Sequence, residues 1–198
     1  MLVSYVSNTL GYRHFGYIDQ KVDINALNPH LFADAAFADD LKTSKSTSGA
    51  YLTLRTQLTT DGAEDFAKLT TDFPLGCSSS SQSCQAHSTP EAEIVAMDAA
   101  IRKLGIPSLS LWNYILQRKD EKGEGSMIIA HEDNSAMIKI CEHGRNPTMR
   151  HLSRTHGISV AVLHELFRDV NSNWKRNLPI RCLRTSLQRV SKNMSRTL

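Results

Sequence analysis

The clearest pattern of hydrophobic and polar positions lies in residues 88–104, STPEAEIVAMDAAIRKL. Its apolar side chains recur at helical spacing, at Ile94, Met97, Ile101 and Leu104. This spacing predicts an amphipathic helix with one face against a core. Ser88 can act as the N-cap, and Glu91 three residues later gives the spacing of a capping box. Glu93 falls on the edge of the apolar face, where a carboxylate is costly unless another group pairs with it or coordinates it.

Shorter apolar runs predict the strands of a sheet. They occupy residues 31–37, 49–54, 73–78 and 127–130, and the third is the weakest. The first run contains one acid, Asp34, and the last is followed directly by Asp133 and its neighbours in the sequence HEDN. Three consecutive strands, a crossover helix and a further strand are typical of a mixed sheet flanked by helices. The predicted fold class is therefore α/β, with three antiparallel strands and one parallel strand.

Further periodic segments predict the remaining helices. They span residues 2–10, 109–118 after a break at 105–107, and 136–143 before Gly144. The apolar residues of 157–168 lie near helical spacing, but apolar and polar positions also alternate at 158–162. A helix is preferred there, and a strand is the alternative. Residues 19–30 read as a loop ending in Asn28-Pro29, and 78–83 as a flexible serine turn. The acidic insertion at 55–72 allows one helical turn at 63–69.

Composition narrows the class of protein. The chain has 198 residues, of which 40% are hydrophobic and 22% charged, as in globular domains. Its four cysteines, without a signal peptide or a run of 18 apolar residues, predict a soluble intracellular protein with no membrane segment. Residues 171–198 carry seven Lys and Arg and no acid, while the other 170 residues carry 16 basic and 20 acidic groups. The basic tail either binds nucleic acid or is an unrelated terminus.

Three acids stand at positions that suit a metal site. Asp34 lies in a predicted strand, Glu93 on a core-facing helix, and Asp133 just after a strand. Ligand sites of α/β sheets gather at the carboxyl ends of strands, and carboxylates that converge there repel one another unless a divalent cation binds. Such clusters can hold two Mg²⁺ ions for displacement at phosphorus. The alternative is that each acid is a cap or surface residue, and Asp133 alone suits an N-cap about as well.

Other candidate sites are weaker. The Cys84/His87 and Cys141/His143 pairs fit no standard zinc spacing, so incidental cysteines are preferred. The basic segment after residue 144 could contact phosphates or be a solvated loop. Its candidate residues for binding nucleic acid are Arg145, Arg150 and Arg154.

Four ordered stretches resemble the ribonuclease H domain at the C-terminal end of copia-type long-terminal-repeat retrotransposon Pol polyproteins. FADAAFADD at 32–40 with KSTSGAYL at 45–52 resembles the family's SDADWAGD and RSTSGY. FPLGCSSSSQSCQAHSTPEAEIVAM at 73–97 is similar to PISWSSKKQ and SSTEAEYIAL. HEDNSAMIKI at 131–140 resembles CDNQSAI, and RNPTMRHLSRTHGISVAVLHELF at 145–167 resembles NP followed by HSRTKHIDIRYHFIRE. The resemblance covers about residues 1–168.

This resemblance implies a ribonuclease H-like domain over residues 31–168. It implies the end of a reverse transcriptase connection and a linker at 1–30, and it leaves the basic tail at 169–198 unassigned. The family's metal-binding catalytic acids fall on Asp34, Glu93 and Asp133, which would hold two Mg²⁺ or Mn²⁺ ions. The aspartate of the family's HIDI motif aligns with Ser159, so a fourth carboxylate is missing, and Cys77 replaces its tryptophan.

The resemblance implies an enzyme that hydrolyses the RNA strand of RNA–DNA hybrids during reverse transcription. Its partners would be the hybrid and an upstream reverse transcriptase domain, because the chain is expected to be a fragment of a longer polyprotein. One alternative is a catalytically degenerate nucleic-acid-binding remnant, which Ser159 favours. Another is a host-recruited interaction domain with the same fold. Metal-dependent cleavage distinguishes the enzyme from both, and salt-dependent hybrid binding distinguishes the remnant from the interaction domain.

Overall fold

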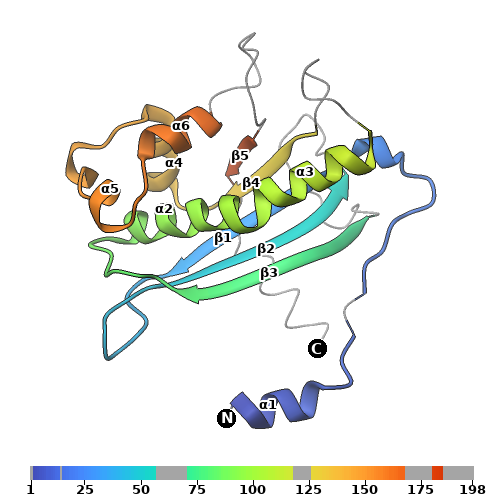
Figure 1. The fold of residues 1–198 in the computed structure, drawn as a ribbon, viewed down its shortest axis with the longest axis horizontal. Helices are drawn as coiled ribbons and strands as arrows, with labels where there is room; N and C mark the ends of the chain where they lie inside the picture. The colour runs from blue at the N-terminus through green and yellow to red at the C-terminus, as the bar shows by residue number, and fades with distance from the viewer. Residues whose placement is uncertain (1, 14, 57–70, 118–125, 168–179, 185–198) are drawn as a thin grey trace.

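A five-stranded mixed sheet forms the centre of the molecule. The computed structural model describes residues 2–13, 15–56, 71–117, 126–167 and 180–184, which Figure 1 draws in colour. Within these residues the strand order is β3-β2-β1-β4-β5. β1 (Leu27–Ala36), β2 (Thr47–Thr56) and β3 (Asp72–Ser81) are antiparallel neighbours. β4 (Ile128–Glu132) runs parallel to β1, and β5 (Ile180–Arg184) runs parallel to β4.

The predicted fold class, an α/β mixed sheet with three antiparallel strands and a parallel strand flanked by helices, is confirmed by this topology. β5 adds a second parallel strand, and it comes from the segment that the sequence left as an unassigned tail. A strand of five residues in a basic, irregular stretch has no periodicity to reveal it, so only its pairing with β4 identifies it. The rest of the 169–198 segment and the predicted turn at 63–69 lie outside the described residues, as do residues 118–125.

β1 begins at Leu27, so the predicted loop ending at Pro29 is too long. Pro29 pairs with Leu54 of β2, but the parallel pairing with β4 begins only at His30. Pro29, which has no backbone N–H, therefore lies before the pairing of β1 with β4 starts, so no hydrogen bond between these two strands is lost. Beyond it, a hydrogen bond of 2.9 Å joins His30 Nδ1 to His131 Nε2, and both rings are buried.

A long helical segment covers the sheet (Figure 1). α2 (Thr89–Ala100) continues through a π-helical turn, Ile101–Gly105, into α3 (Ile106–Ile115). The predicted break at residues 105–107 is therefore wrong. The wider turn lets the Ile106 N–H donate to the carbonyl of Ile101 five residues back, and Pro107 stands in the first turn of α3. The predicted apolar face is confirmed, since Ile94, Met97 and Ile101 are fully buried in the main core.

The start of α2 differs from the predicted capping box. Ser88 is the N-cap, but its side chain makes no capping hydrogen bond. Glu91 does not reach back to Ser88. Its Oε2 accepts the backbone N–H of His87 instead, and its Oε1 lies 3.0 Å from Nε2 of His151. The carboxylate of Glu91 therefore faces histidines from a distant part of the chain.

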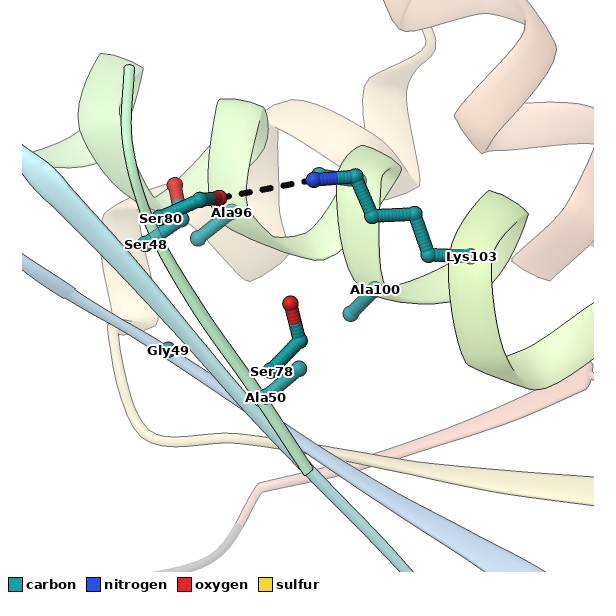
Figure 2. Close-up of a pocket in the computed structure, with 9 residues that line it drawn as sticks. Ser48, Gly49, Ala50, Ser78, Ser80, Ala96, Ala100 and Lys103 are labelled. Atoms are coloured by element: carbon teal, nitrogen blue, oxygen red, sulfur yellow. Dashed lines mark hydrogen bonds between the residues drawn. The ribbon is translucent and has the colours of Figure 1, made fainter. Parts of the chain in front are cut away.

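Small side chains separate α2 from β2 and β3. Ala96 and Ala100 face Gly49 and Ala50 across a small hollow, as Figure 2 shows. Its outer rim is closed by Lys103, whose Nζ lies 3.4 Å from Oγ of Ser80. Residues 78–81 belong to β3, so the predicted serine turn is a strand over most of its length.

Three more helices group beside the N-terminal end of α2 (Figure 1). α4 (Ser135–His143) follows β4 directly, with Asn134 as its N-cap and Gly144 as its left-handed C-cap. The cap role that suited Asp133 therefore belongs to Asn134, whose side chain accepts the N–H groups of Ala136 and Met137. α5 (Leu152–Thr155) is a single turn, and α6 (Val160–Phe167) confirms the helix preferred there over a strand.

The first residues extend away from this body. α1 (Leu2–Thr9) is the predicted short helix. The segment after it meets the sheet through backbone hydrogen bonds between Tyr17 and Asp72. A search of the described helices finds none with the length and apolarity needed to cross a bilayer.

Candidate metal centre

Four acids gather where β1 and β4 end and α2 passes over them. Asp34 is near the end of β1, Glu132 is the last residue of β4, and Asp133 follows it. The parallel register pairs Phe32 with His131, so the next positions along both strands bring Asp34 beside Asp133. Glu93, in the second turn of α2, faces the same place. The structure thus brings the three acids singled out in the sequence together at the carboxyl ends of two parallel strands.

Three of the four carboxylates, those other than Asp34, form a group close enough to share a cation. Oxygen atoms of Glu93, Glu132 and Asp133 all lie within 4.8 Å of one another. Glu93 and Glu132 are buried, with 4% and 0% of their surface exposed, whereas Asp133 and Asp34 are open to solvent. The site therefore has a buried wall of two glutamates and an accessible side of two aspartates.

Burial and mutual repulsion change how these groups titrate. Loss of hydration first, and then the charges of Glu132, Asp34 and Asp133, together raise the pKa of Glu93 to about 8. Burial likewise raises the pKa of Glu132 to about 7, against the opposing hydrogen bond from the Asn134 N–H. The pKa of Asp133 is also raised, by burial first and then by Asp34. These are the shifts expected where several carboxylates meet without a cation.

The chemistry of this donor set fits a hard divalent cation. Among the residues that the structure describes, one oxygen of each buried glutamate, Glu93 Oε2 and Glu132 Oε2, has no hydrogen-bond partner. Within the described part of the chain, no Lys, Arg or His forms an ion pair with any of the four acids. Mg²⁺ and Mn²⁺ prefer carboxylate oxygens, so the residues present suit such ions.

Glu132 is the acid that sequence reasoning missed. The predicted strand ends at Ala130, which leaves His131 and Glu132 outside it. Both belong to β4 and are fully buried. An acid directly at the end of a buried strand was the available signal, because that position faces the ligand edge of an α/β sheet.

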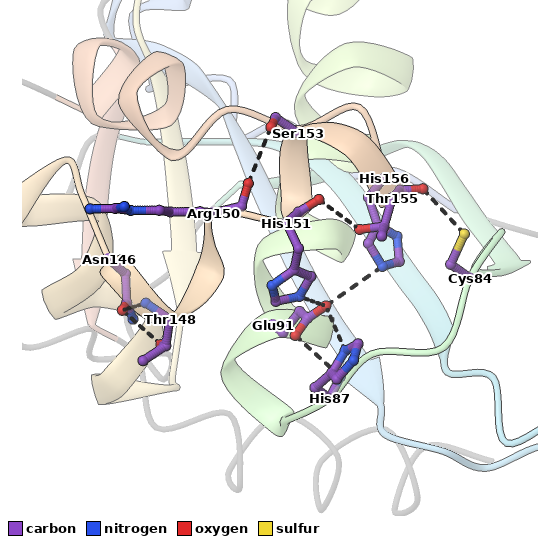
Figure 3. A network of polar contacts seen from close by, with 10 residues as sticks. All are labelled: Cys84, His87, Glu91, Asn146, Thr148, Arg150, His151, Ser153, Thr155 and His156. Carbon is purple, nitrogen blue, oxygen red and sulfur yellow. Dashed lines mark hydrogen bonds and ion pairs between the residues drawn. The ribbon is translucent and has the colours of Figure 1, made fainter.

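The other predicted site residues lie outside this cluster. Ser159 is exposed and precedes α6, where its carbonyl accepts the N–H groups of Val162 and Leu163. Its described contacts do not include the four acids. The predicted phosphate-binding residues, Arg145, Arg150 and Arg154, are all exposed, and Arg150 extends away from the neighbouring histidines in Figure 3.

The cysteines of the weaker zinc candidate have ordinary surroundings. Cys84 donates to the Thr155 carbonyl at 3.2 Å. Cys141 is buried beside the sulfur of Met137. This geometry agrees with the preferred interpretation that they are incidental.

Comparisons with known proteins find little. No protein-family model matches the chain, and no curated protein matches it. Among solved structures, the foamy viral protease-reverse transcriptase in complex with double-stranded DNA is similar, with 14% identity over 89% of this chain and 94% of that chain. The TM-score is 0.41, too low for that likeness to support an argument about fold or function.

Proposed function

We propose that this chain is the ribonuclease H domain of a copia-type retroelement polyprotein and hydrolyses the RNA strand of RNA–DNA hybrids. The observation that carries the proposal is the acidic cluster, with two buried glutamates beside two exposed aspartates at the ends of parallel strands. Its position and composition support a site for divalent cations. The ordered motifs shared with the copia family support the choice of substrate.

The roles of the acids follow from their exposure. Glu93 and Glu132 would hold cations from the buried side with their unpartnered oxygens. Asp34 and Asp133 would complete the coordination on the open side, where a phosphodiester can approach. Two Mg²⁺ or Mn²⁺ ions held there would supply an activated water and stabilise the leaving 3′ oxygen.

Recognition of the hybrid would rest on its backbone. Proteins distinguish such duplexes by A-like geometry, phosphates and 2′-hydroxyl groups instead of base sequence. Exposed Arg145, Arg150 and Arg154 supply positive charge on the segment after α4. We expect each of them to add a salt-dependent contribution to binding.

A cleavage assay with the full chain tests the proposal. Hybrid, double-stranded DNA and double-stranded RNA are each incubated with Mg²⁺, Mn²⁺ or a chelator, and both strands are followed. We expect only the RNA strand of the hybrid to be cut, and only with a cation. Glu93→Gln should lose at least about a hundredfold in rate, because metal-ion stabilisation of such transition states is worth several kcal/mol. Glu142→Gln, the same change at an exposed position of α4, is the matched control.

A second candidate is a non-catalytic nucleic-acid-binding remnant, favoured by the serine at position 159. It predicts hybrid binding that weakens with salt, without cleavage under any cation. Cleavage by Glu93→Gln at the rate of the unchanged protein would contradict the proposed site. Equal cutting of all three duplexes would contradict the proposed substrate.

A further inference from the structure

A second cluster of ligand-type side chains surrounds Glu91 at the start of α2 (Figure 3). His87 comes from the loop before α2, whereas His151 and His156 stand on either side of the single turn of α5. All three imidazoles face one oxygen, Glu91 Oε1. The distances to it are 3.0 Å from His151 Nε2, 3.6 Å from His87 Nδ1 and 3.7 Å from His156 Nε2.

Burial makes this arrangement costly without a further partner. The side chains of Glu91 and His156 are only 2% and 1% exposed. Neither ring nitrogen of His156 has a hydrogen-bond partner in the described part of the chain, although its Nε2 is directed at the shared oxygen. An imidazole left in this state loses the hydrogen bonds it would make with water. The imidazole of His156 therefore has a buried acceptor nitrogen to which no described residue donates a hydrogen bond.

The spacing of the cluster matches a tetrahedral metal ion. Bonds of about 2.0–2.1 Å from zinc to nitrogen or oxygen give neighbouring ligand atoms a separation of about 3.3 Å. The three distances to Glu91 Oε1 fall around that value. Ligand atoms of His87, Glu91 and His151 also all lie within 4.8 Å of one another. His156 is not part of that group, although its Nε2 lies 3.7 Å from Glu91 Oε1. We propose that His87, Glu91 and His151 form a zinc site, with the ring of His156 beside it.

The donor set separates this site from the acidic cluster. Imidazole nitrogen suits Zn²⁺, whereas Mg²⁺ prefers oxygen ligands. Three protein ligands leave the fourth position of a tetrahedral zinc shell to a water or to His156, whose buried ring lies beside Glu91. His87 is 72% exposed, so an ion can enter from solvent. The zinc site would fasten α5 and the basic segment around it to the start of α2.

The test uses Zn²⁺ and Co²⁺ themselves, with the full chain freed of metal by a chelator and without nucleic acid. We expect one tightly bound Zn²⁺ per chain, a higher melting temperature on binding, and the strong visible absorption of tetrahedral cobalt when Co²⁺ replaces it. His87→Gln, at a side chain that is 72% exposed, should weaken Zn²⁺ binding by at least about tenfold. His143→Gln, an exposed histidine of α4, should leave it unchanged.

Several results would overturn the zinc site. These are the absence of Zn²⁺ binding, a weak octahedral cobalt spectrum, or equal Zn²⁺ affinity in the unchanged protein and His87→Gln. Glu93→Gln should keep the tetrahedral cobalt absorption, and its loss in that variant would assign the ion to the acidic cluster instead. Because the readout needs no hybrid, the zinc site can stand or fall independently of the proposed ribonuclease activity.

Discussion

Replacing Glu93 by glutamine should stabilise the metal-free protein at neutral pH. The pKa of Glu93 is about 8 in the fold, against 4.5 for an ordinary glutamate. The folded protein therefore keeps a proton that the unfolded chain loses between those values, and unfolding becomes easier as the pH rises through this window. At about pH 7 the loss amounts to roughly 3 kcal/mol, at about 1.4 kcal/mol for each unit of pKa. Glutamine does not titrate, so the variant escapes this loss.

Urea unfolding in the presence of a chelator measures the effect. Near pH 4, where Glu93 is protonated in both states, the variant and the unchanged protein should have similar free energies of unfolding. Near pH 7 the variant should be more stable by up to about 3 kcal/mol. Added Mg²⁺ should then stabilise the unchanged protein more than the variant. A difference that does not change with pH, or a variant that is less stable at pH 7, would refute the reasoning.

Three further predictions concern the fold and the missing fourth acid. Burial lowers the pKa values of His30 and His131 to about 3 and about 2, so both rings stay neutral in the fold while the same histidines of the unfolded chain are protonated below about pH 6.5. The folded protein therefore loses stability on acidification, and the double variant His30→Leu with His131→Leu should lack up to about 3 kcal/mol of this loss per pH unit. Equal slopes of unfolding free energy against pH in the two proteins would contradict this. Gly144→Ala should cost more stability than Gly157→Ala, by about 1–3 kcal/mol. Both glycines have positive φ, but only a Cβ added at position 144 meets the His164 ring, at 2.7 Å. Equal melting temperatures of the two variants would exclude the clash. Ser159→Asp should raise hybrid cleavage and lower the Mg²⁺ needed for half the maximal rate if the fourth carboxylate is limiting, whereas unchanged rates would show that it is not missed.

The sequence predicts those parts of the site that lie on strongly periodic elements. Glu93 stands out because the apolar spacing of its helix places a charge at the edge of the core. Glu132 does not, since its burial depends on β4 continuing past the apolar run. Pro29 shows the same limit, because local rules begin the strand only after it, whereas pairing with β2 extends β1 back to Leu27.

The histidine cluster was out of reach for a different reason. His151 and His156 lie in an irregular basic segment with no periodicity to orient them. His151 lies 60 residues from Glu91 along the chain, and the approach of both histidines follows from how α5 packs near the start of α2. The capping-box pattern also assigned Glu91 a local role that fits its spacing equally well.

The most direct test of the account measures cation binding and hybrid cleavage in one sample. Mn²⁺ is titrated into the full chain, bound ion is followed by electron paramagnetic resonance, and single-turnover cleavage of a labelled hybrid is recorded at each step. The account predicts that the cleavage rate rises with bound Mn²⁺, and that Glu93→Gln lowers both while Glu142→Gln lowers neither. Mn²⁺ binding that is the same in Glu93→Gln, or cleavage that persists in a chelator, would contradict a cation-dependent site built on Glu93.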